Sequence, residues 1–314
     1  MLPSSEKLSD FYDERYVKGY MEEWPDDKKG RVFEVIRALD LPARGEALDF
    51  GCGNGVFTAI LKKALPRWDV VGCDISKVAI LNAQKKVPDC GFFLSDAAPL
   101  INKKFDFIFS HHVLEHVQDI NGIAMQIQER AKETASMLHI LPCGNKGSFE
   151  HDLCDLRVDE VKKDQEGLFF FEDKGHVRRM TTESCASVFS EFGFILRKQY
   201  YSGQYYGAVN WMTRSHPFFI FYLFNPLKGR NLAAGIQLSV LLGKFILMSA
   251  LRLPFIAYEY FRGKNNFIAA LFLVPAMLSR HFDQYVVSLA EREWQERKTD
   301  LNGSEMYLYF ARSC

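Results

Sequence analysis

Residues 47–58 read Ala47-Leu-Asp-Phe-Gly-Cys-Gly-Asn-Gly-Val-Phe-Thr58, and this stretch decides the fold. An apolar run ending at Phe50 is expected to form a strand, and the helix after it is expected to begin at Val56. Between them stand three glycines, Gly51, Gly53 and Gly55. Glycines at a strand-to-helix turn let the backbone approach a ligand closely, and the first N–H groups of the helix can bind it. The stretch therefore predicts a ligand-binding turn at the end of a strand.

The spacing of these glycines bears on the kind of ligand. It is GxGxG, preceded by Asp49, whereas the dinucleotide fingerprint GxGxxG needs a glycine where this chain has Val56. An acid before the turn suits a ligand with a positive amino group better than one with two phosphates. A nicotinamide-dependent oxidoreductase is therefore disfavoured, but it stays an alternative.

Two further aspartates follow apolar runs that are expected to be neighbouring strands. Asp74 ends the second run, nineteen residues after Gly55, where a carboxylate can accept hydrogen bonds from ribose hydroxyls. Asp96 follows a third run and can accept a hydrogen bond from an adenine amino group. Three acids at consecutive strand ends, together with the glycine turn, predict a site for a ligand that contains ribose and adenine.

The stretch from about 31 to 200 alternates short apolar runs with helical patterns, which is typical of a parallel sheet with crossover helices. The expected strands are 46–50, 69–73, 105–110, 136–141 and 194–201, with a last one at 306–311. The expected helices are 56–64, 77–86, 120–133 and 182–191. The predicted fold class is α/β, with a doubly wound sheet.

Four segments, LDFGCGNGVFT, VVGCDIS, SDAAPL and FDFIFSHHVLEHVQD, stand in the order and at the spacing found in class I S-adenosylmethionine-dependent methyltransferases. The chain resembles this family over about 31–200 and the last strand. The resemblance implies a Rossmann-like methyltransferase sheet, S-adenosylmethionine as cofactor and methyl transfer as the activity. A protein that binds this cofactor without transferring the methyl group is the other alternative.

The resemblance also implies cofactor-binding residues. Asp49, Gly51, Gly53 and Gly55 match the loop around the methionine moiety, and Asp74 with Ile75 matches the ribose and adenine contact. Asp96 and Ala97 match the adenine contact, and Ser110 and His111 match the position whose backbone faces the methyl donor.

One departure from the family sets the domain organisation. The family joins its last two strands by a short connection, whereas here about a hundred residues intervene. We expect an N-terminal helical lid segment at 1–30, a cofactor-binding core at 31–204, a hydrophobic helical insert at 205–304 and a final core strand at 305–314. In the first segment, Tyr12, Tyr16 and Tyr20 recur every four residues and form one helix face that can lie over the cofactor.

Methyl transfer from a sulfonium is an in-line displacement, so the enzyme mainly aligns the acceptor and excludes water. An oxygen or carbon acceptor can also need a base. We predict His176, His151 and His111 as candidates, because they follow elements that end near the donor site; His112 shares the position of His111, and His116 is expected to pack within a short helix. No metal site is predicted, because His151, Asp152 and Cys154 match no common ligand spacing.

The insert is poor in charge. Residues 217–279 carry seven charges in 63 residues, and six of them are positive. Its uncharged runs have 13, 13 and 15 residues, fewer than the ~18 expected of a spanning helix. Gln237, Lys244 and Arg252 are expected on one side of a helix that Pro254 ends. The pattern favours peripheral contact of 205–300 with an anionic membrane surface or a lipid-like acceptor. A single membrane span through 231–251, which would place Lys244 inside the bilayer, and a buried cap over the core are the alternatives.

Composition limits the partners and the compartment. Lys+Arg and Asp+Glu both number 39, which argues against a nucleic-acid partner held by global charge. The seven cysteines form no CxxC pair, and no basic region followed by an apolar run opens the chain. We therefore expect a cytoplasmic protein at the membrane surface, with neither disulfides nor zinc. The predicted function is transfer of a methyl group to oxygen, nitrogen or carbon of a small, apolar or lipid-like acceptor.

Overall fold

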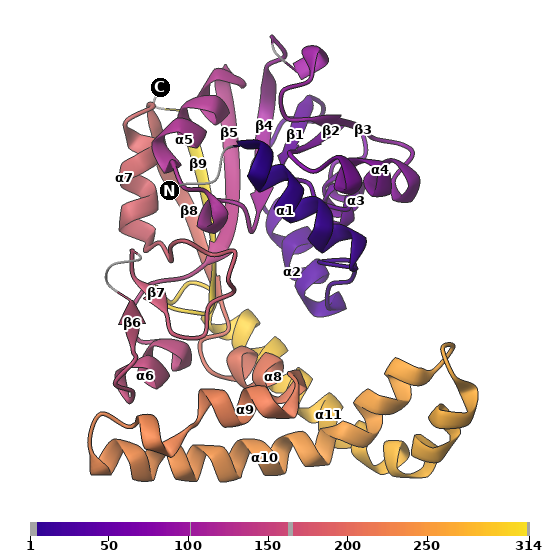
Figure 1. Ribbon diagram of the computed structural model, residues 1–314. Helices are drawn as coiled ribbons and strands as arrows, with labels where there is room; N and C mark the ends of the chain where they lie inside the picture. Colours follow the sequence, from indigo (N-terminus) through magenta and orange to yellow (C-terminus); the bar gives the residue numbers. More distant parts are fainter. Residues whose placement is uncertain (1–4, 101, 163–165, 313–314) are drawn as a thin grey trace. The chain divides into compact units, whose positions relative to one another are not determined.

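The chain divides into two units in the computed structural model, which describes residues 5–100, 102–162 and 166–312 (Figure 1). The first unit comprises Met1–Leu141, Glu183–Gln199 and Tyr307–Cys314. The second comprises Pro142–Thr182 and Tyr200–Met306. It therefore takes in residues 142–182, which the sequence analysis assigns to the cofactor-binding core.

A seven-stranded sheet forms the centre of the first unit, in the order β3-β2-β1-β4-β5-β9-β8. Its strands are β1 (Glu46–Phe50), β2 (Asp69–Asp74), β3 (Gly91–Leu94), β4 (Phe105–His111), β5 (Ala131–Pro142), β8 (Phe194–Ser202) and β9 (Glu305–Arg312). The pairs β1–β2, β2–β3, β1–β4 and β4–β5 are parallel. The predicted Rossmann-like α/β sheet is confirmed, and the last strand does return to it after the insert.

The helices of the first unit are α1 (Ser5–Val17), α2 (Asp26–Arg37), α3 (Val56–Ala64), α4 (Lys77–Lys86), α5 (Ile120–Glu129) and α7 (Thr182–Ser190). Short 3₁₀ turns follow β3 (η1, Ala98–Leu100) and β4 (η2, Leu114–His116). Ser76 and Asp119 cap α4 and α5 by accepting hydrogen bonds from backbone N–H groups of their first turns. The predicted helix 120–133 was too long: α5 ends at Glu129, because Ala131 already pairs with Phe105 in the sheet.

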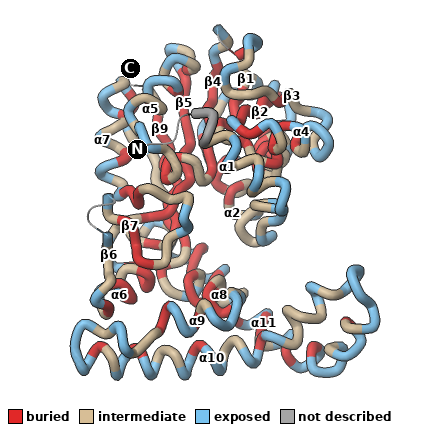
Figure 2. The backbone as a smooth tube through the Cα atoms, in the orientation of Figure 1, coloured by how far each residue is buried: buried red, intermediate tan, exposed pale blue. Residues whose placement is uncertain are grey.

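The core of this unit consists of side chains from the parallel strands, which Figure 2 shows as largely buried. Leu48 of β1 is opposite both Val71 of β2 and Ile108 of β4, and Ile108 is opposite Met137 of β5. Near-continuous apolar strands of this kind are expected in a parallel sheet covered on both faces.

The strand order also positions a site. The chain moves outward from β1 through β2 to β3 and then returns to β4 on the other side of β1. In open α/β sheets the carboxyl ends of the strands at such a reversal form a crevice where ligands bind. Here that crevice begins where β1 ends at Phe50 and β4 ends at His111.

The second unit is mainly helical. Its elements are α6 (Phe149–Asp155), an antiparallel pair β6 (Val161–Lys162) and β7 (Leu168–Phe169), α8 (Tyr206–Arg214), α9 (Pro217–Leu223), η4 (Pro226–Lys228), α10 (Leu232–Phe261) and α11 (Asn266–Arg297). Met212, Ile220, Phe224, Leu238 and Phe245 belong to one buried cluster that joins α8, α9 and α10. The prediction of a helical, apolar region before the last strand is confirmed.

The prediction that Pro254 ends the helix is wrong, because α10 continues to Phe261. Proline lacks an N–H group and disturbs the ladder of backbone hydrogen bonds around it. On α11, the Ser279 hydroxyl accepts from the N–H of Phe255 (3.2 Å) and donates to the carbonyl of Leu251 (2.6 Å). These are the two groups that a straight helix joins to each other. The neighbouring helix therefore supplies partners beside the proline.

Arg252 also differs from the prediction of an outward polar stripe. Its guanidinium is buried, and Nε lies 2.8 Å from Oδ1 of Asp283 on α11. It also donates to Oγ1 of Thr213 (2.6 Å) and to Oδ1 of Asn210 (2.7 Å). Arg252 therefore fastens α10 to α8 and α11. Gln237 and Lys244 do lie on the exposed side.

Candidate active site

The glycine turn after β1 has the geometry that only glycine adopts without strain. Gly51, Gly53 and Gly55 have φ angles of +77°, +50° and +78°. A Cβ on Gly51 would lie 2.4 Å from Cγ2 of Val113, and one on Gly53 would lie 2.8 Å from the hydroxyl oxygen of Tyr16. Gly55 is the N-cap of α3. The turn is thus a close-approach loop at the N-terminus of a helix.

A cavity of about 410 Å³ borders this turn, and every residue that lines it belongs to the first unit. The ends of β1, β2 and β4 form part of its wall. Side chains of the N-terminal segment between Leu8 and Trp24 form another part. Its ring-bearing lining residues are Tyr12, Tyr16, Tyr20, Trp24, Phe50, Phe57, His111, His112 and His116. The volume falls in the range of small-molecule sites.

Asp74 lies at the end of β2 with its carboxylate directed to the turn. Oδ2 accepts from the N–H of Gly53 and Oδ1 from the N–H of Ser76, both at 2.9 Å. Burial raises the pKa of Asp74, although these backbone hydrogen bonds act against the rise. Each carboxylate oxygen retains acceptor capacity beyond one hydrogen bond. Ile75, next in the chain, also lines the cavity.

Asp49 is buried beside the same turn. Its Oδ2 accepts a 2.5 Å hydrogen bond from the Thr58 hydroxyl of α3. Burial raises the pKa of Asp49 to about 7, and the nearby Asp74 carboxylate adds to the rise. A carboxyl group in this state gains its charge most readily when a cation is close.

The structure brings six of the predicted cofactor residues to the cavity: Asp49, Gly51, Gly53, Asp74, Ile75 and His111. The other four, Gly55, Asp96, Ala97 and Ser110, are absent from its lining, and each has an identifiable place. Gly55 caps α3, Asp96 is exposed after β3 while its neighbour Ser95 lines the cavity, and the Ser110 hydroxyl bonds Nδ1 of His139 at 2.7 Å. These assignments stay predictions.

The ring of His111 is packed among aromatic side chains. It stacks on Phe57 with ring centroids 3.7 Å apart, and the edge of Trp24 meets it at 4.9 Å. The side chain is buried at the cavity wall. This placement suits a residue that shapes the wall, and its role as a base stays a prediction.

His112 is the residue that the sequence analysis did not single out. Its φ of +54° is unusual for a side chain other than glycine. Its Nδ1 lies 2.7 Å from Oε1 of the buried Glu115, and its Nε2 lies 3.1 Å from Nζ of Lys28. The three-residue spacing between His112 and Glu115 is a signal that the sequence contains. The contact with Lys28, at a separation of 84 residues, has no such local signal.

Tyr12, Tyr16 and Tyr20 all line the cavity, and burial raises the pKa of Tyr16. The prediction that the three form one helix face is wrong for Tyr20, because α1 ends at Val17 and Tyr20 lies in the turn that follows. Asp13, on the same helix, accepts from the N–H of Val78 at 3.2 Å and is hydrogen-bonded to the Ser76 hydroxyl. A carboxylate at the start of α4 is favourable because the N–H groups there carry partial positive charge. The role of the N-terminal segment as a lid over the cofactor stays a prediction.

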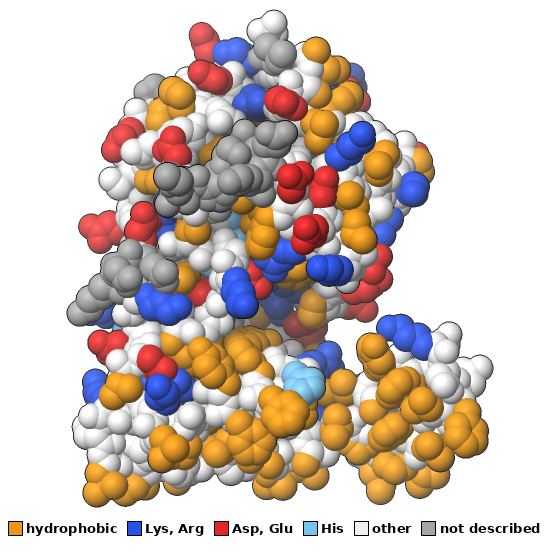
Figure 3. Space-filling view, in the orientation of Figure 1, with side chains coloured by type: hydrophobic (Ala, Val, Ile, Leu, Met, Phe, Trp, Pro, Cys, Tyr) orange, Lys and Arg blue, Asp and Glu red, His pale blue; other side chains and the backbone are white. Residues whose placement is uncertain are grey.

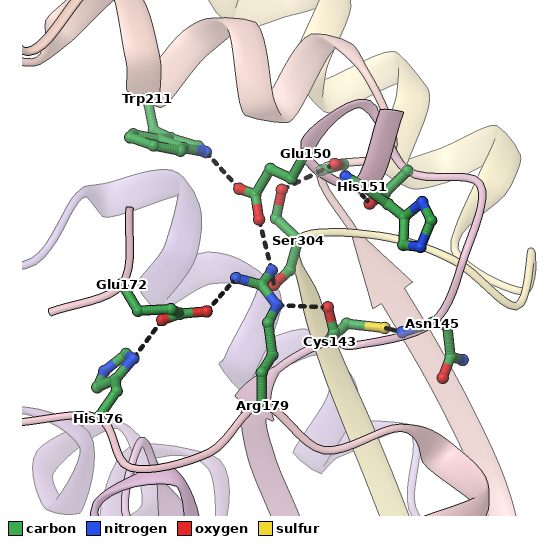
Figure 4. Close-up of polar contacts among 11 residues, drawn as sticks. Cys143, Asn145, Glu150, His151, Glu172, His176, Arg179, Trp211 and Ser304 are labelled. Carbon is green, nitrogen blue, oxygen red and sulfur yellow. Dashed lines mark hydrogen bonds and ion pairs between the residues drawn. The ribbon is translucent and has the colours of Figure 1, made fainter. Parts of the chain in front are cut away.

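The other two predicted bases, His151 and His176, belong to the second unit. Nδ1 of His151 lies 3.5 Å from Oδ2 of Asp155. Figure 4 shows His176 beside Glu172, with Nδ1 hydrogen-bonded to Oε2. Their part in catalysis stays a prediction.

Glu172 in turn belongs to a buried network that the sequence analysis missed (Figure 4). Arg179 donates to Oε1 of Glu172 at 2.6 Å, to Oε2 of Glu150 at 2.5 Å and to the carbonyl of Cys143 at 2.7 Å. Glu150 also accepts from the indole N–H of Trp211 at 2.9 Å. Burial acts to raise the pKa of Glu172, but Arg179 and His176 together outweigh it and hold that pKa below its usual value.

Comparison with known proteins identifies the family. The methyltransferase domain family matches residues 20–199, more than half of the chain. The trans-aconitate 2-methyltransferase of Methylobacterium radiotolerans is 30% identical over 95 residues, which are 30% of this chain and 36% of that protein. The ubiquinone/menaquinone biosynthesis C-methyltransferase UbiE of Desulfotalea psychrophila is 27% identical over 130 residues, 40% of this chain and 52% of that protein.

Among solved structures, the YcgJ protein of Bacillus subtilis aligns with a TM-score of 0.42 and 15% identity, covering 54% of this chain and 71% of that one. The chain spans about a third to a half of the length of the two curated relatives. The family match over residues 20–199 covers the glycine turn and the ends of β1, β2 and β4. The chain therefore belongs to the class I family of S-adenosylmethionine-dependent methyltransferases.

Proposed function

We propose that the protein transfers a methyl group from S-adenosylmethionine to an oxygen, nitrogen or carbon atom of a small, apolar or lipid-like acceptor. The observation that carries the proposal is the cavity at the ends of β1, β2 and β4, which combines a left-handed glycine turn with two buried carboxylates. When bound, S-adenosylmethionine supplies a methyl group on a positively charged sulfur.

The residues at the turn fit this cofactor. Gly51 and Gly53 have left-handed φ angles and leave room for Val113 and Tyr16, so the turn keeps a form that a larger residue would disturb. Asp74 has acceptor capacity for ribose hydroxyls, and Asp49 offers a carboxyl group whose ionised form a cation stabilises. We therefore assign the methionine end to Asp49, Gly51, Gly53 and Gly55, the ribose to Asp74 and Ile75, the adenine side to Asp96 and Ala97, and the backbone facing the donor to Ser110 and His111.

The character of the remaining wall supports an apolar acceptor. Tyr12, Tyr20, Trp24 and Phe57 give the cavity flat aromatic surfaces. Such surfaces align a ring or a chain by contact and exclude water from an in-line displacement. One named relative acts in quinone biosynthesis and another on trans-aconitate, which supports a small molecule as the acceptor class. For an oxygen or carbon acceptor, we assign the base to His111, His151 or His176.

Labelled methyl transfer tests the proposal. The full chain is incubated with S-adenosylmethionine labelled in its methyl group and with a bacterial lipid extract, and the organic phase is counted. We expect label in the organic phase and its loss in the Asp74→Ala variant. Label confined to small polar products would contradict an apolar acceptor.

Two alternatives give different results in the same preparation. Calorimetric binding of S-adenosylmethionine without transfer to the lipid extract or to an aqueous cell extract would indicate a binding protein without activity. Binding of a nicotinamide dinucleotide instead would indicate an oxidoreductase. We further propose that the enzyme works on the cytoplasmic side of a membrane, which residues 205–300 contact.

A further inference from the structure

The helices α10 and α11 are apolar on two opposite sides. On α10, the buried positions are Ala234, Leu238, Phe245 and Arg252, which recur at helical spacing. They face the cluster formed with α8 and α9. A helix at the surface of a water-soluble domain normally presents polar residues on its other side. On α10 the exposed side carries few polar residues, among them Gln237 and Lys244, and is mainly apolar.

That other side exposes large aliphatic and aromatic side chains. On α10 these are Leu232, Ile236, Val240, Leu247 and Leu251, and on α11 they are Phe267, Leu271, Val274 and Leu278. Each of the nine is between 45% and 82% exposed, and the helical spacing places them in one stripe on each helix. Figure 3 shows hydrophobic side chains gathered along α10 and over the end where the two helices meet. Contiguous apolar surfaces of this extent mark interaction sites.

The charges beside these stripes are mostly positive. Lys228, Arg230, Lys244, Arg262 and Lys264 are exposed at the ends and along the flank of α10. The exposed acid among them, Glu259, lies 3.6 Å from the Arg262 guanidinium. Lys264 lies over the ring of Tyr260, 4.1 Å from its centroid. Apolar stripes bordered by cations and tyrosine complement a bilayer that contains anionic lipid.

We propose that the α10–α11 hairpin is a membrane-docking surface that lies in the plane of an anionic lipid bilayer, with its exposed apolar stripes among the acyl chains and its cations at the phosphates. The proposal deepens the proposed function by naming the surface from which a lipid-like acceptor is drawn, and it rests on that function only for the acceptor.

The packing of α10 favours an in-plane orientation over a spanning one. By length and composition α10 is long and apolar enough to cross a membrane. However, its exposed stripe runs from Leu232 to Leu251, about 28 Å along the helix axis, while Leu238 and Phe245 on the opposite side pack in the cluster formed with α8 and α9. Crossing the bilayer would also bring Lys244 near its centre, which is costly.

The same charges favour a bilayer over a second copy of this chain. In a symmetric pair the positive flank of one hairpin would meet the positive flank of the other, and like charges at an interface are unfavourable. Anionic lipid instead offers the opposite charge to every cation. Lipid is therefore a better partner for the exposed apolar stripes than a second copy of the chain.

Vesicle flotation of the full chain tests the proposal. We expect the wild type to float with phosphatidylglycerol/phosphatidylcholine vesicles at low salt, and to float less at high salt and with phosphatidylcholine alone. The variant Leu271→Glu with Val274→Glu places two charges on the α11 stripe and should lower partitioning by about tenfold or more. Leu301→Glu, at an exposed position outside the hairpin, is the matched control and should float like the wild type.

Each other outcome counts against the docking surface. A wild type that stays soluble with anionic vesicles overturns it, as does equal flotation of the doubly charged variant. If the wild type forms a dimer without lipid and the doubly charged variant is a monomer, a second copy of the chain covers this face instead of a bilayer. Circular dichroism and calorimetric binding of S-adenosylmethionine are measured on every variant. A wild type that does not bind S-adenosylmethionine would count against the proposed function, but the flotation result would still test the docking surface.

Discussion

The side-chain nitrogen of Lys28 lies 3.1 Å from Nε2 of His112, across 84 residues of chain. An ammonium group only donates hydrogen bonds, so Nε2 must be the accepting nitrogen. The ring proton of the neutral imidazole is therefore on Nδ1, which lies 2.7 Å from Oε1 of Glu115. A lysine and a buried glutamate thus hold one histidine of the cavity wall in a defined tautomer.

We expect nitrogen-detected NMR at mildly alkaline pH to show His112 with a protonated Nδ1 and an unprotonated Nε2. The signal is assigned by its loss in His112→Gln. In Glu115→Gln the acceptor opposite Nδ1 is weaker, so the population should move toward the Nε2–H tautomer. A wild-type ring already protonated on Nε2 would refute the arrangement.

Replacement of Asp74 by alanine should weaken S-adenosylmethionine binding by roughly ten- to a hundredfold, because hydrogen bonds to a charged acceptor contribute about 1.5–3 kcal/mol. Isothermal calorimetry measures the change. Asp89→Ala removes an exposed acid from the turn before β3 and serves as the control, with unchanged affinity expected. Equal affinity of folded Asp74→Ala and wild type would remove Asp74 from the site.

The pKa of Asp49, about 7 in the folded protein, lies above its usual value of 3.8, so the cofactor-free protein should lose stability as pH rises. Between these two values the folded state holds a proton that the unfolded state has released. The contribution is fully present below pH 3.8, falls through the interval and is gone above pH 7, for a total of at most about 4 kcal/mol. The difference in unfolding free energy between wild type and Asp49→Asn, measured against pH, should follow this curve. A pH-independent difference would mean that folding leaves the pKa of Asp49 unchanged.

Binding of S-adenosylmethionine should release a proton at pH values below about 7, because the positively charged ligand favours the ionised form of Asp49. Calorimetry in buffers of different ionisation enthalpy detects the release as a change in apparent binding enthalpy. In Asp49→Asn this buffer dependence should shrink. If the variant and the wild type release the same number of protons, another group supplies them.

Ser279 should stabilise the helical hairpin through the two backbone groups beside Pro254 that it contacts. Ser279→Ala removes the hydrogen-bond partner of the Phe255 N–H and of the Leu251 carbonyl. It should lower the free energy of unfolding in urea by about 1–3 kcal/mol. In a Pro254→Ala background the helix can restore its own hydrogen bond, so the same substitution should cost less. Ser288→Ala, on an exposed side of α11, is the control. If Ser279→Ala costs the same stability in both backgrounds, Ser279 does not compensate for Pro254.

Local patterns predicted the first half of the sheet well. The bounds of β1, α3 and α4 agree with the sequence analysis, because glycine turns and caps close to each element determine where it begins and ends. The aspartates at the ends of β1 and β2 could be predicted for the same reason. Asp49 and Asp74 both reach the cavity, whereas the exposed Asp96 does not line it.

The wrong predictions for the end of α5, for Pro254 and for Arg252 all arise where a residue distant in the sequence determines the local structure. Ala131 is a strand residue because it pairs with Phe105, and Pro254 stays within a helix because Ser279 provides hydrogen bonds. Arg252 points inward because Asp283, 31 residues later, neutralises it there. None of these partners is visible in the spacing of residues within one helix or strand.

The position of β9 has a consequence for how the chain folds. It lies between β5 and β8, although it follows both of them, and the helices α8 to α11, in the chain. In the described sheet β8 has no other neighbour, so this edge cannot form until residues 305–312 have left the ribosome. Slow, long-range closure of this kind is expected to delay folding. Loss of residues 305–312 would leave the edges of β5 and β8 open to pairing with other chains.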